Sequence, residues 1–296
     1  MTTANNQRHV TVIGLGSMGA ALTRAFITKG YRPTVWNRDS TKVKALTDVG
    51  ASAAPTLTAA IESSEVIVLC VSDYKATRAI LETEDVVKAL HGRKLIQLST
   101  GTPKEARDLD LWVQQQGATC LNGDIMAWPR QMGTDAATIS VSGDADVYHQ
   151  QKNILQALAG NVVYVSNEPG ASAALFHAVL AYLAGSWIGF CHGALVCEKE
   201  GLRVDELGVL LEQISPVLSV ELRHMGEVIQ HGRFDNPEST IKTTGDDLQL
   251  LVQQANEAGI NSELPKFAAD LFKRAMKAGY DQEEHAAVIK VLRKTA

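Results

Sequence analysis

Short, continuous apolar runs alternate with amphipathic helical patterns along the first half of the chain. Such runs are typical of parallel strands buried on both faces, and their alternation with helices predicts a doubly wound α/β sheet. The predicted strands cover residues 10–13, 34–36, 65–71, 94–98, 118–121, 137–142 and 161–165, and the helices between the later ones cover residues 56–63, 75–90, 103–116 and 145–158.

The pattern changes at residues 167–170, and from there to the carboxyl end the spacing of apolar residues is helical. The sequence therefore predicts two domains, a sheet domain at residues 1–166 and an all-α domain at residues 167–296. The helices expected in the second domain cover residues 170–198, 204–228, 239–258, 264–278 and 284–295.

The first of these helices contains no charged residue between Glu168 and Glu198. Its length alone would allow a membrane span. It also carries His177, His192 and several glycines and serines, and a helix that is apolar all round is also typical of a large core. We therefore expect a long central helix that joins the two domains and packs against a second subunit, rather than a membrane anchor.

Composition narrows the class of protein. The 296 residues carry a net charge of −5 and contain no basic run, so nucleic-acid binding is not expected. The four cysteines show no CxxC spacing and are interpreted as small buried hydrophobes in a reducing cytoplasm. They are Cys70, Cys120, Cys191 and Cys197.

A glycine motif joins the first predicted strand to a helix. Gly14 permits a tight turn, Gly16 allows close approach of a pyrophosphate, and Gly19 lets the helix pack against the strand. The free N–H groups at the start of that helix, with Leu15, Ser17 and Met18 in the same turn, suit phosphate binding. The motif predicts a Rossmann-type dinucleotide site, and the alternative is a glycine-rich turn in an unrelated α/β domain.

The end of the second strand indicates which dinucleotide is bound. An Asp or Glu at this position is typical of NAD binding, whereas this chain has Asn37, Arg38 and, one turn later, Lys42. Arg38 suits the 2′-phosphate of NADPH through its planar fork, and Lys42 adds a second positive charge. The alternative is an ordinary solvated cluster near Asp39.

Several blocks along nearly the whole chain together resemble the imine reductase and reductive aminase family of the β-hydroxyacid dehydrogenase superfamily. The block at residues 122–127 (Asn-Gly-Asp-Ile-Met-Ala) and the block at 259–265 (Gly-Ile-Asn-Ser-Glu-Leu-Pro) are the most particular to that family. The others are at residues 14–19, 35–38 with Lys42, 70–74, 98–103, 133–134 and 270–272.

The resemblance implies an NADPH-dependent reductase of C=N bonds. It also implies a domain-swapped homodimer, with the active site between the Rossmann domain of one subunit and the helical domain of its partner. The block at 70–74 places Val71 and Ser72 against the cofactor. Thr100 is expected near the nicotinamide, because it follows a strand at the carboxyl edge of the sheet.

Two ways of locating the family's usual acid give two neighbouring residues. Counting six residues from Gly170, where the superfamily carries a lysine, gives Phe176, which cannot transfer a proton. Local similarity instead aligns His177 with the family's aspartate, and a protonated histidine suits an imine nitrogen near neutral pH. Tyr182 is a further candidate donor. One alternative is that His177 is a core histidine. The other is that no acid is needed, because many imines are already protonated iminium ions in neutral water and accept hydride without help.

A substrate wall is expected from aromatic and apolar side chains. Met126, Trp128 and Trp187, with Phe176, suit a cationic iminium partly through cation–π attraction, and core packing is the alternative for each.

We therefore expect reduction of cyclic imines or iminium ions to amines, with an imine, or a carbonyl plus an amine, as substrate. Two other hypotheses remain. The first is reduction of a small carbonyl acid, which the missing lysine argues against. The second is a non-catalytic NADPH-binding sensor, which Phe176 leaves open.

Overall fold

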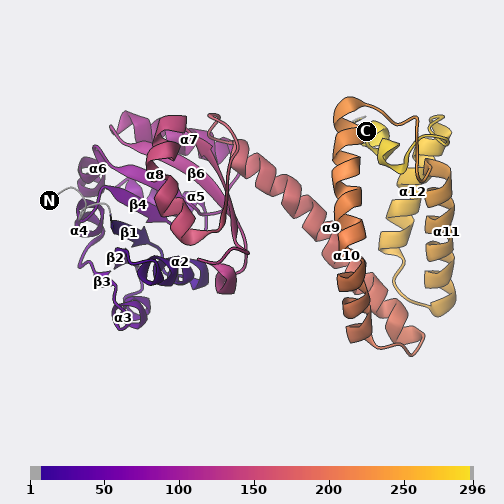
Figure 1. The fold of residues 1–296 in the computed structure, drawn as a ribbon, viewed down its shortest axis with the longest axis horizontal. Coiled ribbons are helices and arrows are strands. Elements are labelled where there is room, and N and C mark those ends of the chain that lie inside the picture. Colours follow the sequence, from indigo (N-terminus) through magenta and orange to yellow (C-terminus); the bar gives the residue numbers. More distant parts are fainter. Residues whose placement is uncertain (1–7, 294–296) are drawn as a thin grey trace. The chain divides into compact units, whose positions relative to one another are not determined.

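The computed structural model describes residues 8–293. Two compact units divide within helix α9 (Ala171–Lys199), between Ala181 and Tyr182. The first unit contains an eight-stranded sheet that is flanked by helices (Figure 1). In the second unit the described residues form helices, with one isolated β-bridge between Thr240 and Glu284.

The sheet confirms the predicted doubly wound α/β class, with strand order β3-β2-β1-β4-β5-β6-β7-β8. Each predicted strand is present, and the two-residue β3, which has no apolar run, is additional. The strands are β1 (His9–Ile13), β2 (Arg32–Trp36), β3 (Ser52–Ala53), β4 (Val66–Leu69), β5 (Lys94–Gln97), β6 (Thr119–Met126), β7 (Thr138–Gly143) and β8 (Asn161–Tyr164).

The last two strands, β7 and β8, run opposite to the other six. β7 runs antiparallel to β6, whereas the other neighbouring pairs are parallel. The connection between β6 and β7 contains only the short 3₁₀ helix η1 (Pro129–Gln131), and a parallel neighbour would need a longer crossover. β6 also continues to Met126, five residues beyond its predicted end, so the block at residues 122–127 lies largely within a strand.

The helices of the first unit follow the predicted pattern with two exceptions. α3 (Thr41–Thr47) is additional, and the helix expected at 75–90 is different. It is divided in two, because Thr83 has an extended backbone and the acidic residues Glu84 and Asp85 start a new first turn. The helices are α2 (Ser17–Thr28), α3 (Thr41–Thr47), α4 (Leu57–Glu62), α5 (Tyr74–Leu81), α6 (Glu84–Leu90), α7 (Pro103–Gln115) and α8 (Ala145–Leu158).

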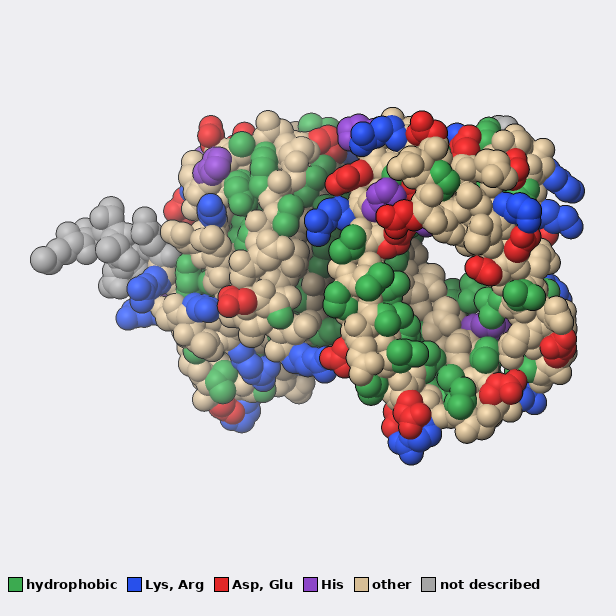
Figure 2. Space-filling view, turned by 45° about the vertical axis from the view of Figure 1, so that its right-hand side comes forward, with side chains coloured by type: hydrophobic (Ala, Val, Ile, Leu, Met, Phe, Trp, Pro, Cys, Tyr) green, Lys and Arg blue, Asp and Glu red, His purple; other side chains and the backbone are tan. Residues whose placement is uncertain are grey.

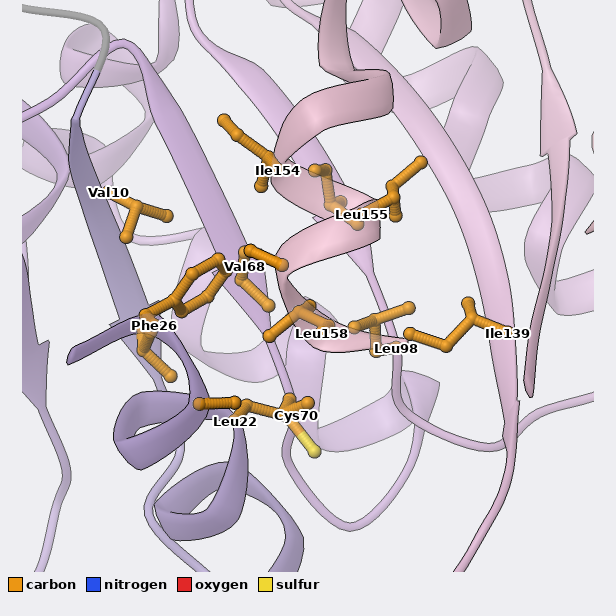
Figure 3. Close-up of a cluster of buried hydrophobic side chains, with 14 of the residues drawn as sticks. Val10, Leu22, Phe26, Val68, Cys70, Leu98, Ile139, Ile154, Leu155 and Leu158 are labelled. Carbon is orange, nitrogen blue, oxygen red and sulfur yellow. The ribbon is translucent and has the colours of Figure 1, made fainter. Parts of the chain in front are cut away.

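Two buried clusters cover the two faces of the sheet, and the central strands contribute to both. On β4, Val68 belongs to the cluster under α2 and α8, whereas Ile67 and Leu69 belong to the cluster under α4 to α7. Figure 3 shows the first cluster, in which Phe26 from α2 and Leu158 from α8 point toward Val68. Because both faces are covered, the strands read as continuous apolar runs.

The second unit has its own small core around the end of α10, formed by Val228, Phe234, Ile241, Ala275 and neighbouring residues. The last predicted helix, at 284–295, is instead a 3₁₀ turn followed by a single helical turn, and residues 294 and 295 lie outside the described residues. The elements after α9 are α10 (Val204–His231), α11 (Ile241–Ala258), α12 (Glu263–Lys277), η2 (His285–Val288) and α13 (Ile289–Leu292).

Helix α9 matches the predicted central helix at 170–198 almost residue for residue. By length and composition it is the one helix in the described chain that is apolar enough to cross a membrane. Cys70 and Cys120 are buried as expected, but Cys191 is exposed and Cys197 is half-buried. The expectation of buried cysteines is therefore wrong for these two, since the described chain leaves their part of α9 uncovered.

The packing of α2 onto the sheet makes a testable prediction. Phe26 has no exposed surface, so Phe26→Ala leaves a large cavity and is expected to lower the free energy of unfolding by about 3–5 kcal/mol. Leu111→Ala, at a side chain that is 60% exposed, is the control and should change it by less than about 0.5 kcal/mol. Urea unfolding followed by circular dichroism measures both. Equal effects from the two variants would contradict this packing.

Candidate functional site

The turn between β1 and α2 requires glycine at two positions for internal reasons. Gly14 has a φ of +93°, and a Cβ there would lie 2.3 Å from the carbonyl oxygen of Cys70. A Cβ on Gly19 would lie 1.9 Å from the carbonyl oxygen of Gly14. Gly16 differs, because an added Cβ would meet nothing within 4 Å. Packing within the described chain therefore explains why glycine is required at positions 14 and 19, but it does not explain glycine at position 16.

The amino terminus of α2 lies at this turn without a capping side chain. Gly16 is the N-cap residue and makes no side-chain hydrogen bond, so the first N–H groups of the helix are available to a ligand. The turn itself is fixed to the end of β2. The N–H of Gly14 donates to the carbonyl oxygen of Trp36 at 3.1 Å, and the N–H of Leu15 donates to Oδ1 of Asn37 at 2.9 Å. A rigid, positively polarised helix end of this kind suits an anion.

A groove of about 510 Å³ runs along this turn. It brings together all of the residues predicted to bind the cofactor except Thr100. Among those that line it are Gly14, Leu15, Gly16, Ser17, Met18, Gly19, Asn37, Arg38, Lys42, Val71 and Ser72.

The positive end of the groove is formed by Arg38 and Lys42. Within residues 8–293 neither side chain makes an ion pair with a carboxylate. The nearby Asp39 is directed elsewhere, since its Oδ1 accepts hydrogen bonds from the N–H of Thr41 at 3.0 Å and from its hydroxyl at 2.6 Å. These hydrogen bonds lower the pKa of Asp39. Within the described residues Asp39 therefore forms no ion pair with Arg38 or Lys42. These two positive side chains suit a phosphate monoester.

A chain of buried polar groups holds the opposite wall. The N–H of Val71 donates to Oγ of Ser99 at 2.9 Å, and Ser99 donates to Oε1 of Gln97 at 3.2 Å. Nε2 of Gln97 continues the chain to Oγ1 of Thr77 at 2.8 Å. This series of hydrogen bonds links the loop after β4 to the end of β5. Thr100 follows Ser99 directly and is exposed at the carboxyl end of β5.

Asp124 is a site residue that sequence reasoning did not single out. It lies on β6, opposite Ser140 of β7, and only 5% of its surface is exposed. Burial raises the pKa of its carboxyl group to about 6, while the Ser172 hydroxyl and the positive charge of His177 act in the opposite direction. The signal was the lone carboxylate in the block at 122–127, and it was missed because β6 was expected to end at residue 121.

His177 lies on α9, near enough to Asp124 for their charges to interact. Its Nδ1 is 2.8 Å from the carbonyl oxygen of Ala173, an acceptor, so this ring nitrogen carries a hydrogen and Nε2 is left for other partners. Phe176 is half-buried and meets the His177 ring edge-on, with 6.1 Å between the ring centroids. α9 has no break here, so no irregularity of the helix accounts for the one-residue difference between the two counts.

The remaining predicted residues are distributed over both units. Met126 ends β6, and Trp128 begins the turn into η1 with 61% of its surface exposed. Tyr182 and Trp187 belong to the second unit and are each 49% exposed on α9. The structure thus groups the cofactor residues and the His177–Asp124 pair within the first unit, and the roles of the substrate residues stay predictions.

Comparisons with known proteins agree with this arrangement. Residues 9–166 match the model of the NAD binding domain of 6-phosphogluconate dehydrogenase. Residues 168–294 match the model of the C-terminal domain of NADPH-dependent reductive aminase-like proteins.

Individual relatives extend over the full chain. An NADPH-dependent reductive aminase of Aspergillus oryzae is 26% identical over 95% of this chain and 96% of its own length. An imine reductase from Myxococcus stipitatus in complex with NADP+ has a TM-score of 0.90 at 28% identity, covering 96% of this chain and 99% of that one. A reductive aminase from Aspergillus terreus in complex with NADPH4, cyclohexanone and allyl amine has a TM-score of 0.88 at 27% identity, covering 97% and 99%.

The chain also matches longer proteins, among them the cytokine-like nuclear factor N-PAC of Drosophila melanogaster, at 22% identity over 46% of that protein's length. The two family models match the two halves of this chain in order, and the reductive aminase and imine reductase relatives cover nearly all of it. On these grounds the chain belongs to the imine reductase and reductive aminase family.

Proposed function

We propose that this protein reduces the C=N bond of cyclic imines or iminium ions to amines, with NADPH as the hydride donor. One observation carries the proposal: a groove with two free cations at its ribose end is joined to a reductive aminase-like helical domain. Cyclohexanone and allyl amine, present together in the Aspergillus terreus structure, support a substrate class of imines, or of carbonyls plus amines.

The residues of the groove fit NADPH. The N–H groups at the start of α2 face the pyrophosphate, and the bare Gly16 leaves room for it. Arg38 and Lys42 would hold the 2′-phosphate. Val71 and Ser72 of the groove, together with Thr100 at the end of β5, would hold the nicotinamide end. When bound, NADPH supplies the hydride, and the protein supplies orientation and exclusion of water.

The proton comes from His177. Because Nδ1 is held by the carbonyl oxygen of Ala173, Nε2 is the atom that delivers the proton to the imine nitrogen. Asp124 lies near enough to this donor for the two charges to interact. Phe176, Met126 and Trp128, all in the first unit, supply apolar side chains for the substrate.

A second copy of the chain completes the site. Large apolar side chains are exposed on α9 and α10, and Figure 2 shows hydrophobic side chains at the surface of the helical unit. Exposed apolar surface on this scale marks an interaction site, and we assign it to a domain-swapped homodimer rather than to a membrane. The side chains include Trp187, Ile188, Phe190, Leu195, Val209, Leu210, Val217 and Val220.

In this dimer the NADPH-binding domain is residues 1–166 and the dimerisation domain is residues 167–296, because the two family matches meet between residues 166 and 168. The four free cysteines support a reducing, cytoplasmic location.

The cofactor preference tests the positive end of the groove. Arg38→Ala removes a charge-assisted contact worth about 1.5–3 kcal/mol, so NADPH affinity should fall about 10- to 100-fold while NADH affinity changes little. Lys44→Ala is the control, since Lys44 pairs with Asp48 and is not among the groove residues. Fluorescence titration with both nucleotides measures the ratio. An equal loss for NADPH and NADH would show that Arg38 does not contact the 2′-phosphate.

The proton donor is tested with two matched substrates, 2-methyl-1-pyrroline and its N-methylated iminium salt, across pH 5 to 10. Only the first needs a proton, so His177→Ala should slow its reduction about 10²- to 10⁴-fold and leave the iminium rate nearly intact. An unchanged imine rate in His177→Ala would assign protonation to solvent. Tight NADPH binding without turnover of either substrate by the wild type would instead favour the sensor hypothesis.

The assembly is tested by light scattering coupled to size-exclusion chromatography. The wild type should have twice the mass of one chain, and Ile188→Asp should shift it toward the monomer, because a carboxylate would be buried in the interface. Leu111→Asp, at a similarly exposed side chain of the first unit, should leave the dimer intact. A wild type with the mass of a single chain would overturn the dimer.

A further inference from the structure

A cluster of two carboxylates and an imidazole lies in the second unit. One of its residues comes from α10 and the other two from the start of η2. Glu221, Glu284 and His285 each offer one ligand atom, and these atoms lie within 4.8 Å of one another. Glu221 projects from α10, whereas Glu284 and His285 lie 63 or more residues later at the start of η2. The tertiary fold, rather than local sequence, therefore assembles the cluster.

The backbone holds these side chains in place. The N–H of Glu284 donates to the carbonyl oxygen of Phe234 at 2.9 Å, and the N–H of His285 donates to that of Ser239 at 3.0 Å. Glu284 also forms the isolated bridge with Thr240. The segment that carries two of the three side chains is thus tied to the connection between α10 and α11.

Unpartnered buried atoms in the cluster point to a ligand. Glu284 is 2% exposed, and within the described chain its Oε1 has no hydrogen-bond partner. Oε1 of Glu221 and Nδ1 of His285 are likewise buried without hydrogen bonds. Nε2 of His285 approaches Oε1 of Glu221 to 3.1 Å as an ion pair, but not in hydrogen-bond geometry. A buried carboxylate oxygen without a donor is costly unless a positive group faces it.

We propose that Glu221, Glu284 and His285 bind a divalent transition-metal cation of the Zn²⁺ class. Two carboxylate oxygens and one imidazole nitrogen form a donor set that suits Zn²⁺, whereas Mg²⁺ and Ca²⁺ favour oxygen ligands alone. The cation supplies the positive charge that Oε1 of Glu284 lacks. Glu221 and His285 are partly exposed, so the cation reaches the site from solvent.

His224 acts as a positioning residue for this site. It lies one helical turn after Glu221 on α10, and its Nε2 contacts Oε2 of Glu284 at 3.1 Å. One oxygen of Glu284 is thereby oriented by an imidazole while the other faces the cation, as is common for metal-bound carboxylates. The cation joins α10 to the segment that begins η2. This role is independent of the proposed reductase activity, because none of these residues lines the dinucleotide groove.

The test is calorimetric titration of Zn²⁺ into untagged protein that has been stripped with a chelator and dialysed. We expect one site per chain, a loss of at least tenfold in affinity in Glu284→Gln, and a loss of about 10- to 100-fold in His224→Ala. Glu227→Gln, which alters an exposed carboxylate on the same helix, is the control and should bind like the wild type. Zn²⁺ should raise the melting temperature of the wild type and of Glu227→Gln, but not that of Glu284→Gln.

Co²⁺ provides a second measurement with a spectroscopic signal. Its visible absorption bands should appear in the wild type and be lost in His285→Gln, which serves if Glu284→Gln does not fold. The absence of a Zn²⁺ site in the wild type would overturn the proposal. Equal Zn²⁺ affinity in the wild type, Glu284→Gln and His285→Gln would also overturn it, leaving two ordinary ion pairs.

Discussion

The close backbone approach at the β1–α2 turn is the constraint on which the site depends. The carbonyl oxygen of Gly14 occupies the place where a Cβ of Gly19 would be, and the carbonyl oxygen of Cys70 crowds Gly14 in the same way. These contacts bring the start of α2 to the ends of β1 and β4. The groove lies along this turn, and side chains such as Arg38 and Lys42 line the part to which we assign the choice of nucleotide.

Much of the fold was predictable because the central strands are covered on both faces. Runs such as β4 contain only apolar residues, and such a run has few alternatives to a buried parallel strand. The antiparallel β7 was not predictable from its own sequence, because its direction follows from the length of the connection before it. The break at Thr83 was missed for a related reason, since helical periodicity continues on both sides of it.

The site divides in the same way between local and distant contributions. The cofactor groove follows a contiguous motif, so its residues could be named from the sequence. Asp124 and His177 meet only because β6 pairs with β7 and α9 begins beside them, and the sequence left Phe176 and His177 as alternatives. No sequence motif indicates the Glu221–Glu284–His285 cluster. Its residues come from two segments of the helical unit that are distant in the sequence, and only the tertiary fold brings them together.

The three glycines of the turn have different evolutionary consequences. Substitution of Gly14 or Gly19 forces backbone atoms apart, so selection for folding alone would retain both. Gly16 has open space beside it, so selection for folding alone would not retain glycine at this position. In the binding mode proposed above, a descendant of this chain would lose its nucleotide through a substitution of Gly16 and keep its architecture. Folding thus depends on Gly14 and Gly19, whereas the proposed cofactor binding depends on Gly16, only a few residues away.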